Sequence, residues 1–263
     1  MIFMKAQMYS IEGKATKEVE LPSQFSADVR PDLIARAAIS DQTKHYQPKG
    51  NDPRAGMETS ARYKGRKEDF GSGKNKGTAI RPREILPKGR LGKVKRIPSA
   101  VKGRRAHPPH VNKIIIEMMN KKEYRLALIS AIAATAHKST VEARGHKVTV
   151  ALPIVFDNSF EALSKTSQVL QAISPLVGND LARCLKPKLR TGVRKRKGGK
   201  IYPKSVIIAV SSDSPVLRAA RNMAGVDVVK VSDLTVEKLA PGAKAGRLAI
   251  YTQAALSEIA KLQ

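Results

Sequence analysis

The stretch from Lys44 to His110 has a composition that does not support a hydrophobic core. Its 67 residues include 19 Lys and Arg against five Asp and Glu, and nine Gly and seven Pro against only seven Ile, Leu or Val. The sequence on both sides has the apolar periodicity of a folded domain. Structureless loops of this length are unusual in compact domains unless they are functional or disordered. We therefore expect one globular domain, formed by residues 1–43 and 111–263, with residues 44–110 inserted into it as a long extended basic loop.

The formal net charge of +27 is concentrated in two segments. The inserted loop contributes +14, and the run from Arg183 to Lys204 contributes +10, because it has ten Lys and Arg and no acidic residue. The remaining residues are therefore close to neutral. Blocks of like charge repel one another and tend to become ordered on a partner of opposite charge. This distribution predicts a polyanionic partner that the inserted loop penetrates or lies against.

Short apolar runs outside the loop predict an α/β fold. Four runs are almost continuously apolar, as expected for strands covered on both faces: 148–156, 206–210, 226–231 and 248–251. Short strands are also expected within the first 21 residues, joined by a turn at Glu12-Gly13-Lys14. Helices are predicted over 32–43, 120–138 and 160–172 and after three later caps, with candidate N-caps at Asn120, Ser159, Ser214, Ser232 and Thr252. This alternation predicts an open, mostly parallel sheet with helices on both faces.

The glycine-rich patch from Gly71 to Thr78 does not have the spacing of a nucleotide-binding loop. A P-loop requires Gly, four residues and then Gly-Lys-Ser/Thr, and the residue that follows the four here is Lys76. The dinucleotide-binding pattern also fails, because Gly77 falls one residue late and no strand precedes the patch. Flexible backbone that approaches RNA closely is the interpretation that remains.

No other residues assemble a catalytic or metal-binding pattern. His107 and His110 flank two prolines, with no cysteine or carboxylate cluster nearby. Asp157, Asp213 and Asp233 follow predicted strands, where an α/β fold places its ligand crevice, but each adjoins a predicted cap. We therefore assign these carboxylates to local capping, and we expect no enzymatic activity, no cofactor and no metal.

The sequence also favours a cytoplasmic protein. Its one cysteine, Cys184, excludes an intrachain disulfide and is expected to pack as a small apolar residue. The longest apolar run, Leu126 to Ala136, is far shorter than the roughly 20 residues that a bilayer span needs. The first residues have no signal-peptide layout. We expect no membrane partner and no homo-oligomer.

The chemistry that the two basic segments offer is phosphate binding. Lys and Arg neutralise phosphates and release counterions, and Arg adds planar bidentate donors. Aromatic rings interleaved with the cations offer stacking surfaces for unpaired bases: Tyr46, Tyr63 and Phe70. The predicted RNA-binding cations are Lys44, Lys49, Arg54, Arg62, Lys64, Arg66, Lys67, Lys74, Lys76, Arg81, Arg83, Lys88, Arg90, Lys93, Lys95, Arg96, Lys102, Arg104, Arg105, Arg190, Arg194, Lys195, Arg196, Lys197 and Lys200.

Three segments together resemble one known family. Gln47-Pro48-Lys49-Gly50-Asn51-Asp52-Pro53-Arg54-Ala55-Gly56-Met57, Gly71-Ser72-Gly73-Lys74 and Gly103-Arg104-Arg105-Ala106-His107-Pro108-Pro109 resemble the archaeal and eukaryotic branch of the universal large-subunit ribosomal protein family L-four. The resemblance covers essentially the whole chain. The length, which ends at Gln263 without a long C-terminal extension, is similar to that of the archaeal form.

The resemblance implies a structural constituent of the large ribosomal subunit that binds large-subunit ribosomal RNA. It implies a globular α/β domain on the ribosomal surface and a long loop that reaches the subunit core. The loop tip would help line the nascent-peptide exit tunnel, which gives Arg66, Gly71, Ser72, Gly73, Lys74, Lys76 and Thr78 as tunnel-tip candidates. The implied partners are this RNA, neighbouring large-subunit proteins and the nascent peptide.

Two readings from other classes stay open at this point. One is an α/β enzyme that acts on nucleic acid, with its site in the crevice beyond Phe156 and Val210. It requires a perturbed catalytic group there, and the sequence shows none. The other is a DNA-architectural protein. DNA-binding proteins usually read grooves with a folded helix or ribbon, whereas the composition of this cationic loop predicts no regular structure.

Overall fold

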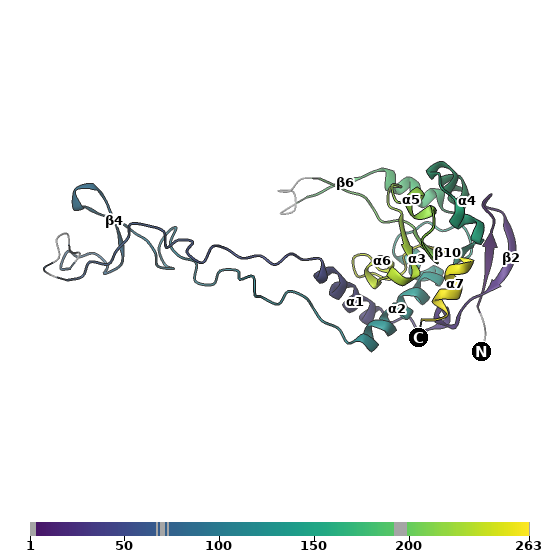
Figure 1. The fold of residues 1–263 in the computed structure, drawn as a ribbon, viewed down its shortest axis with the longest axis horizontal. Coiled ribbons are helices and arrows are strands. Elements are labelled where there is room, and N and C mark those ends of the chain that lie inside the picture. Colours follow the sequence, from purple (N-terminus) through teal and green to yellow (C-terminus); the bar gives the residue numbers. More distant parts are fainter. Residues whose placement is uncertain (1–3, 67, 69–71, 73, 192–198, 263) are drawn as a thin grey trace. The chain divides into compact units, whose positions relative to one another are not determined.

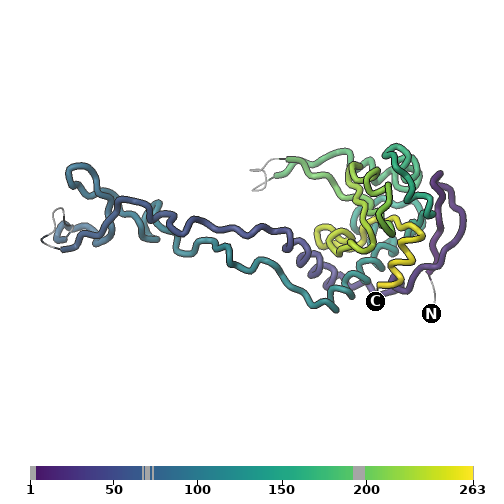
Figure 2. The backbone as a smooth tube through the Cα atoms, in the orientation of Figure 1, coloured from purple at the N-terminus to yellow at the C-terminus, as the bar shows by residue number. Residues whose placement is uncertain are grey.

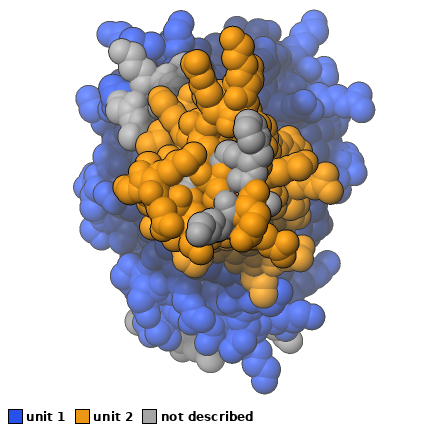
Figure 3. Space-filling view, turned by 90° about the vertical axis from the view of Figure 1, so that its left-hand side faces the viewer, with its two compact units in different colours: residues 1–45, 116–263 blue, residues 46–115 orange. Residues whose placement is uncertain are grey.

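The fold is that of a computed structural model, in which residues 4–66, 68, 72, 74–191 and 199–262 are described (Figure 1). The chain divides into two compact units. Unit 1 comprises residues 1–45 and 116–263, and unit 2 comprises residues 46–115 (Figure 3). Each unit has its own local structure and is considered by itself.

Unit 1 is built on a six-stranded sheet with the order β2-β1-β5-β10-β8-β9. The five strands β1, β5, β10, β8 and β9 are parallel to one another, and β2 pairs with β1 antiparallel at one edge of the sheet. The strands are β1 Lys5–Tyr9, β2 Ala15–Glu20, β5 Ile154–Phe156, β8 Ile207–Val210, β9 Asp227–Lys230 and β10 Ala249–Thr252. The predicted open, mostly parallel sheet is confirmed.

Helices cover both faces of this sheet (Figure 1). Side chains of α1, α2, α6 and α7 pack on one face, and side chains of α3, α4 and α5 pack on the other. The helices are α1 Pro31–Lys44, α2 Lys121–Ala136, α3 Lys138–Ala143, α4 Thr166–Leu185, α5 Val216–Ala220, α6 Val236–Leu239 and α7 Gln253–Ile259. Short 3-10 turns complete the unit at η1 Ser23–Ser26, η3 Asn158–Ala162 and η5 Val231–Asp233.

Alternation along the strands explains why the core has two halves. Ile207 and Ala209 of β8 belong to the cluster beneath α1 and α2, whereas Ile208 and Val210 belong to the cluster beneath α4. All four residues are buried, as the continuous apolar run predicts. Each fully buried Val or Ile side chain stabilises the fold by roughly 1.5–3 kcal/mol. In sequence, the inserted loop lies between α1 and α2, and the second basic segment lies between α4 and β8.

Several predicted element boundaries were wrong. The helix predicted over 160–172 begins later than expected. Its first residues belong to the 3-10 turn η3, and α4 begins only at Thr166. The reason is tertiary. Glu161 accepts hydrogen bonds from Ser211 N at 3.0 Å and from Thr252 Oγ1 at 2.5 Å, which hold this segment against the carboxyl ends of β8 and β10. The apolar run 148–156 forms a strand only over its last three residues, after Pro153, which lacks a backbone donor.

The predicted helix caps had mixed outcomes. Thr252 Oγ1 accepts from Ala255 N at 3.2 Å and caps α7 as predicted. Asn120 stands at the N-cap of α2 but makes no capping hydrogen bond. Ser214 and Ser232 cap nothing either, because α5 begins after Pro215 and α6 after Thr235. Of these predicted caps, only Thr252 therefore makes the expected hydrogen bond.

Unit 2 has more local structure than its composition predicts. Strands β3 Arg83–Ile85 and β4 Leu91–Val94 form an antiparallel hairpin around the 3-10 turn η2 Pro87–Gly89. The Ala61 side chain is fully buried beside this hairpin. The outgoing and returning chains of the unit lie side by side in Figure 2, and Asn51 N donates to Pro109 O at 3.4 Å. The inserted segment thus pairs with itself through backbone contacts rather than through an apolar core.

Two glycines in unit 2, Gly56 and Gly103, lie where two backbone segments approach each other closely. Gly56 has a φ of +81°, and a Cβ atom there would lie 2.6 Å from Gly103 O. A Cβ atom on Gly103 would collide with the carbonyl oxygen of Ile97. Both obstacles are backbone atoms, which cannot rotate away. Glycine at these two positions is therefore a requirement of this close approach.

Candidate nucleic-acid interface

The cations predicted to contact RNA lie at the surface wherever the structure describes them. Those in unit 2 are exposed, except for Lys64, Arg83 and Lys95, which are half-buried. In the 183–204 segment, Arg190 and Lys200 are exposed. The predictions for Lys67, Arg194, Lys195, Arg196 and Lys197 lie outside the described residues.

Lys44 differs from the other predicted RNA contacts because it is the last residue of a helix, α1 of unit 1. Its ammonium lies 2.8 Å from Asp41 Oδ1 and 5.2 Å from the centre of the Tyr124 ring. Tyr124 Oη donates to Asp41 Oδ2 at 2.8 Å. Burial, together with the neighbouring Asp41, raises the pKa of Tyr124 above its ordinary value. Lys44 thus helps to hold the end of α1, and its contact with RNA stays a prediction.

The hairpin of unit 2 gives order to the cations around it. Arg62 and Arg83 exchange two backbone hydrogen bonds, of 3.1 and 3.2 Å, so that Arg62 adds a third chain segment beside β3. Arg83 Nη2 donates to Ala79 O at 3.2 Å, and Arg96 Nη1 donates to Ala61 O at 3.3 Å. Each of these guanidinium groups keeps further donors for an external acceptor, because an arginine has five N–H groups.

Three of the predicted cations have left-handed backbone conformations. The φ values are +61° at Lys88, +72° at Arg96 and +59° at Lys102. Such conformations cost of the order of 1 kcal/mol each in a residue other than glycine, and they cluster at functional sites. Local strain at three basic residues in one small unit supports a role in which the position of each charge matters.

Most cations of unit 2 have no acidic partner. Apart from Lys64, the Lys and Arg side chains that the structure describes in unit 2 form no ion pair. In unit 1, by contrast, carboxylates accompany cations on the surface and in the interior, as in the Arg36–Glu123 and Lys230–Asp213 pairs. The electrostatic potential around unit 2 is therefore positive and is not neutralised from within.

The aromatic and tip candidates of unit 2 are also accessible. Tyr46 and Tyr63 are 56% and 58% exposed, whereas Phe70 lies outside the described residues. Among the tip candidates, Arg66, Lys74, Lys76 and Thr78 are exposed and Ser72 is half-buried, with Ser72 Oγ accepting from Lys74 N at 3.2 Å. Gly71 and Gly73 lie outside the described residues. These assignments are not tested by the geometry and stay predictions.

Two short strands within the second basic segment pair to form the base of a hairpin. Strands β6 Lys188–Leu189 and β7 Lys200–Ile201 pair antiparallel, and Arg190 N donates to Gly199 O at 3.3 Å. The charge run from Arg183 to Lys204 gave no sign of this pairing. The side chains of β6 and β7 are all exposed, so the hairpin is held by backbone hydrogen bonds alone.

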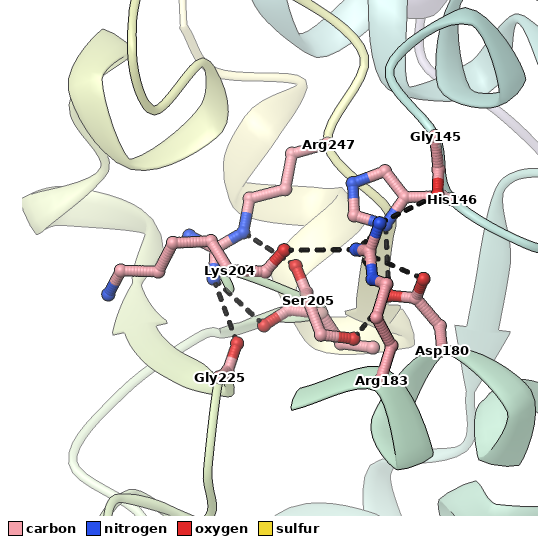
Figure 4. Close-up of polar contacts among 9 residues, drawn as sticks. Gly145, His146, Asp180, Arg183, Lys204, Ser205, Gly225 and Arg247 are labelled. Atoms are coloured by element: carbon pink, nitrogen blue, oxygen red, sulfur yellow. Dashed lines mark hydrogen bonds and ion pairs between the residues drawn. The ribbon is translucent and has the colours of Figure 1, made fainter. Parts of the chain in front are cut away.

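A buried polar cluster closes the root of this segment (Figure 4). Asp180 of α4 lies before the segment and Ser205 lies after it, and Ser205 Oγ donates to Asp180 Oδ2 at 2.5 Å. His146 Nδ1 lies 2.9 Å from the same oxygen, and Arg183 Nη2 lies 3.1 Å from Oδ1. Arg183 also donates to Lys204 O at 3.4 Å. The two ends of the segment are therefore joined through one buried carboxylate.

Arg247, two residues before β10, connects the residues before β8 with α6 and β9 beside this cluster. Its side chain is only 1% exposed, and its guanidinium donates to Ser205 O at 2.8 Å and to Val206 O at 3.1 Å. A further nitrogen donates to Lys238 O at 2.8 Å, and Asp227 Oδ2 lies 2.6 Å away. A buried charge is tolerated only when it is paired and hydrogen-bonded, and Arg247 meets both conditions.

Opposing effects set the pKa values of the two carboxylates. Burial alone raises the pKa of Asp180, but hydrogen bonds from His146 and Ser205 and the Arg183 charge outweigh it and hold the pKa below the ordinary value. The pKa of Asp227 is likewise lowered, because Arg247 and Lys204 outweigh the effect of burial. Both side chains are thus held in their charged forms, as members of a structural ionic cluster.

The carboxyl ends of the strands, where an enzyme site was considered, carry a structural carboxylate. Beyond the carboxyl ends of β8 and β10, Glu161 accepts from Ser211 and Thr252, as described above. Asp157 accepts from Asn158 N at 2.8 Å, in agreement with its predicted capping role. Asp213 instead pairs with Lys230, and Asp233 accepts from Ser232 Oγ at 3.3 Å.

The described part of the chain has no metal-binding cluster and no membrane-spanning helix. No group of three or more His, Cys, Asp or Glu side chains there has a metal-binding arrangement, and both His107 and His110 are exposed. Cys184 is a free, fully buried thiol whose pKa is raised by burial. None of the described helices is long and apolar enough to span a membrane.

Comparison with known proteins identifies the family. Residues 19–262 match the model of the ribosomal protein L4/L1 family. The chain belongs to this family. It is 44% identical to the large ribosomal subunit protein uL4 of Methanosphaera stadtmanae over 263 residues, which cover 98% of this chain and 97% of the relative. The uL4 protein of Methanocaldococcus jannaschii is 43% identical, with 97% of this chain and 98% of the relative covered. That of Haloquadratum walsbyi is 41% identical, with 98% and 99% covered.

Membership settles the class of protein. The family consists of structural ribosomal proteins and not of enzymes, so the chain is a structural constituent of the ribosome. The resemblance read from the three motifs is confirmed. Sequence reasoning missed the cluster around Asp180, because His146, Asp180 and Ser205 lie in three separate segments that only the fold brings together.

Proposed function

We propose that the chain assembles into the large ribosomal subunit and binds large-subunit ribosomal RNA through unit 2 and the 183–204 segment. The relatives that it matches are named large ribosomal subunit proteins. The observation that carries the proposal is the set of exposed cations in unit 2 that lack acidic partners. Each phosphate that such cations neutralise releases counterions, and binding strengthens with the number of contacts.

In this proposal the two parts of the chain have different roles. Unit 1 supplies a stable domain at the subunit surface, in line with the predicted division into residues 1–43 with 111–263 and residues 44–110. The inserted loop reaches toward the subunit core, where RNA surrounds its backbone. Glycine-rich backbone without side chains can approach phosphates closely, and Arg side chains add bidentate contacts. Tyr46, Tyr63 and Phe70 offer rings on which unpaired bases stack.

The loop tip would have a second task. Arg66, Lys74, Lys76 and Thr78, together with Gly71, Ser72 and Gly73, would help line the nascent-peptide exit tunnel. Partners would then include neighbouring large-subunit proteins and the emerging peptide in addition to RNA, all within the cytoplasmic ribosome. The support for this part is the family resemblance and the exposure of the described tip side chains.

The test is retention on purified large subunits during washing. An affinity that rests only on surface phosphate contacts falls by about 10³–10⁵ between roughly 50 and 200 mM salt. A loop enclosed by folded RNA cannot leave until that RNA opens. We expect the chain to stay with large subunits through high-salt washing. A variant in which residues 46–115 are replaced by a short Gly-Ser linker should be washed off, and equal retention of both proteins would contradict the proposal.

A comparison of nucleic acids tests the DNA-architectural alternative. At matched salt, the full chain should bind structured large-subunit RNA more tightly than duplex DNA of equal length. A cationic loop without a recognition helix has no element shaped for the DNA major groove. Equal affinity for the two polymers would count against the ribosomal RNA proposal.

A further inference from the structure

Unit 2 contains a hollow with a volume of about 230 Å³ beside the β3–β4 hairpin. Its walls include the basic residues Arg62, Lys74, Arg81 and Arg83, and the apolar or aromatic residues Tyr63 and Ile80. Among the described residues that line it, none is acidic. A hollow with cations on some walls and an aromatic ring on another differs from a solvated basic surface, which offers charge but no enclosure.

The backbone around the hollow is fixed by hydrogen bonds. The paired backbones of Arg62 and Arg83 form one side, through bonds of 3.1 and 3.2 Å. The Arg83 guanidinium is held by Ala79 O at 3.2 Å, and the Arg81 guanidinium donates to Ser99 Oγ. Two of the cations are thus positioned before any ligand arrives, which reduces the entropy lost on binding.

Gly65 sets the position of the aromatic ring. A Cβ atom on Gly65 would collide with Oη and Cζ of Tyr63, so the phenol ring lies directly against the glycine backbone. The Tyr63 side chain is 58% exposed and Ile80 is 68% exposed, so both present apolar surface to an incoming group. The backbone of Gly65 has an ordinary φ that other residues can adopt. Glycine is needed there because a side chain would occupy the space of the Tyr63 ring.

We propose that this hollow receives one unpaired nucleotide of an RNA strand. The base lies against Tyr63 and Ile80, and the flanking phosphates are bound by Arg81, Arg83 and Lys74. Recognition of RNA commonly uses bases that are splayed out and stacked on aromatic or guanidinium planes, and a nucleotide combines the planar apolar part and the anion that these walls fit. The inference rests on the proposed RNA-binding function and assigns a specific place to one base within it. An acidic peptide would also satisfy the cations but has no planar group for Tyr63.

The test uses the full chain and a short single-stranded RNA in which one base is 2-aminopurine, whose fluorescence is quenched by stacking. We expect quenching on binding by the unaltered protein. Tyr63→Ala should abolish the quenching and weaken the affinity by roughly tenfold, since stacking of one base on an aromatic ring is usually worth that much. Tyr63→Phe should preserve both. When the same RNA is part of a duplex, its 2-aminopurine is already stacked, and binding of the protein should cause no further quenching.

A second variant separates the position of the ring from its presence. Gly65→Ala keeps every cation and the tyrosine but displaces the ring, and we expect loss of quenching with overall binding retained. Leu86→Ala removes an exposed apolar side chain of the same unit outside the hollow, and it should change neither signal. Quenching that survives Tyr63→Ala, or an acidic peptide that displaces the RNA more strongly than free nucleotide does, would overturn the inference. Failure of the full chain to bind RNA at all would instead reject the proposed function.

Discussion

Buried arginine in unit 1 and exposed arginine in unit 2 have opposite roles: in unit 1 the charge is satisfied within the fold, and in unit 2 it is not. In unit 1, Arg247 is buried and its charge is satisfied by Asp227 and by backbone carbonyls. In unit 2, Arg104 and Arg105 are exposed and form no ion pair. Charges of the first kind stabilise the fold that contains them. Those of the second kind repel one another, and they lower the free energy of the molecule only when an external anion is bound.

The largest effect on stability is expected from Arg247→Ala. Loss of a buried charged partner typically costs about 3–5 kcal/mol, and here the backbone carbonyls of Ser205 and Lys238 lose the donor that Arg247 supplies. Urea unfolding monitored by circular dichroism should show a loss of this size. Arg247→Lys, which keeps the charge but not the planar fork, should lose less and remain folded. Arg104→Ala in unit 2 is the matched control and should change stability by less than about 0.5 kcal/mol. Equal losses in both units would remove the distinction between them.

Acid should weaken unit 1 through the buried Asp180 and the half-buried Asp227. The pKa values of Asp180 and Asp227 are lower in the folded protein than in the unfolded chain, where an Asp has a pKa of about 3.9. Their contribution to stability is therefore fully present above about pH 4 and is lost as the pH falls through the lower folded-state values. Unfolding free energies measured across this range should fall steeply for the unaltered protein. Asp180→Asn should reduce the steepness, and a profile unchanged by this substitution would show that Asp180 is not linked to folding.

Two glycine substitutions should act on the two units in opposite directions. Gly103→Ala places a Cβ atom against the Ile97 carbonyl, so the close backbone approach in unit 2 must shift at a cost of roughly 1–3 kcal/mol. Gly178 of α4 has open space around its Cα, and alanine there should stabilise unit 1 by about 1 kcal/mol. Hydrogen exchange resolved by peptide can report each unit separately. Loss of protection in unit 1 after Gly103→Ala would mean that the two units do not unfold independently.

The smallest effect on stability is expected from neutralisation of Arg104 and Arg105. The double Gln variant should unfold within about 0.5 kcal/mol of the unaltered protein. Its binding to large-subunit RNA should nevertheless lose about two units from the slope of log K against log salt, since each phosphate contact contributes about 0.9. Lys14→Gln, which removes a cation that Glu12 already pairs on unit 1, should leave this slope unchanged. A salt slope that is the same for all three proteins would place the phosphate contacts elsewhere.

The sequence predicted the parts of the fold that depend on local pattern. The apolar runs around Ile208 and Ile250 had to be covered on both faces, and α1 could be placed within one residue at each end from its apolar face and Pro31. The failures arose where distant residues determine the structure. The turn at 158–162 depends on Ser211 and Thr252, and the cluster around Asp180 joins His146, Asp180 and Ser205 from three separate segments.

For the candidate site, composition identified the kind of chemistry but not its arrangement. Charge and aromatic content were sufficient to predict RNA contacts from Arg62, Tyr63 and Arg81. The hairpin that brings these residues around one hollow has an apolar content too low to be recognised as a strand pair. Such a hairpin depends on backbone hydrogen bonds and on the close approach of Gly92 to Glu84, and neither produces a periodic pattern in the sequence.

Hydrogen–deuterium exchange of the full chain, free and bound to large-subunit ribosomal RNA, tests the central contrast most directly. The account predicts that core amides of β8 and β10 in unit 1 are protected equally in both states. Amides of unit 2 should exchange faster in the free protein and gain the largest protection on the RNA. Unit 2 amides that are as protected without RNA as with it, or an RNA-dependent change confined to unit 1, would contradict the account.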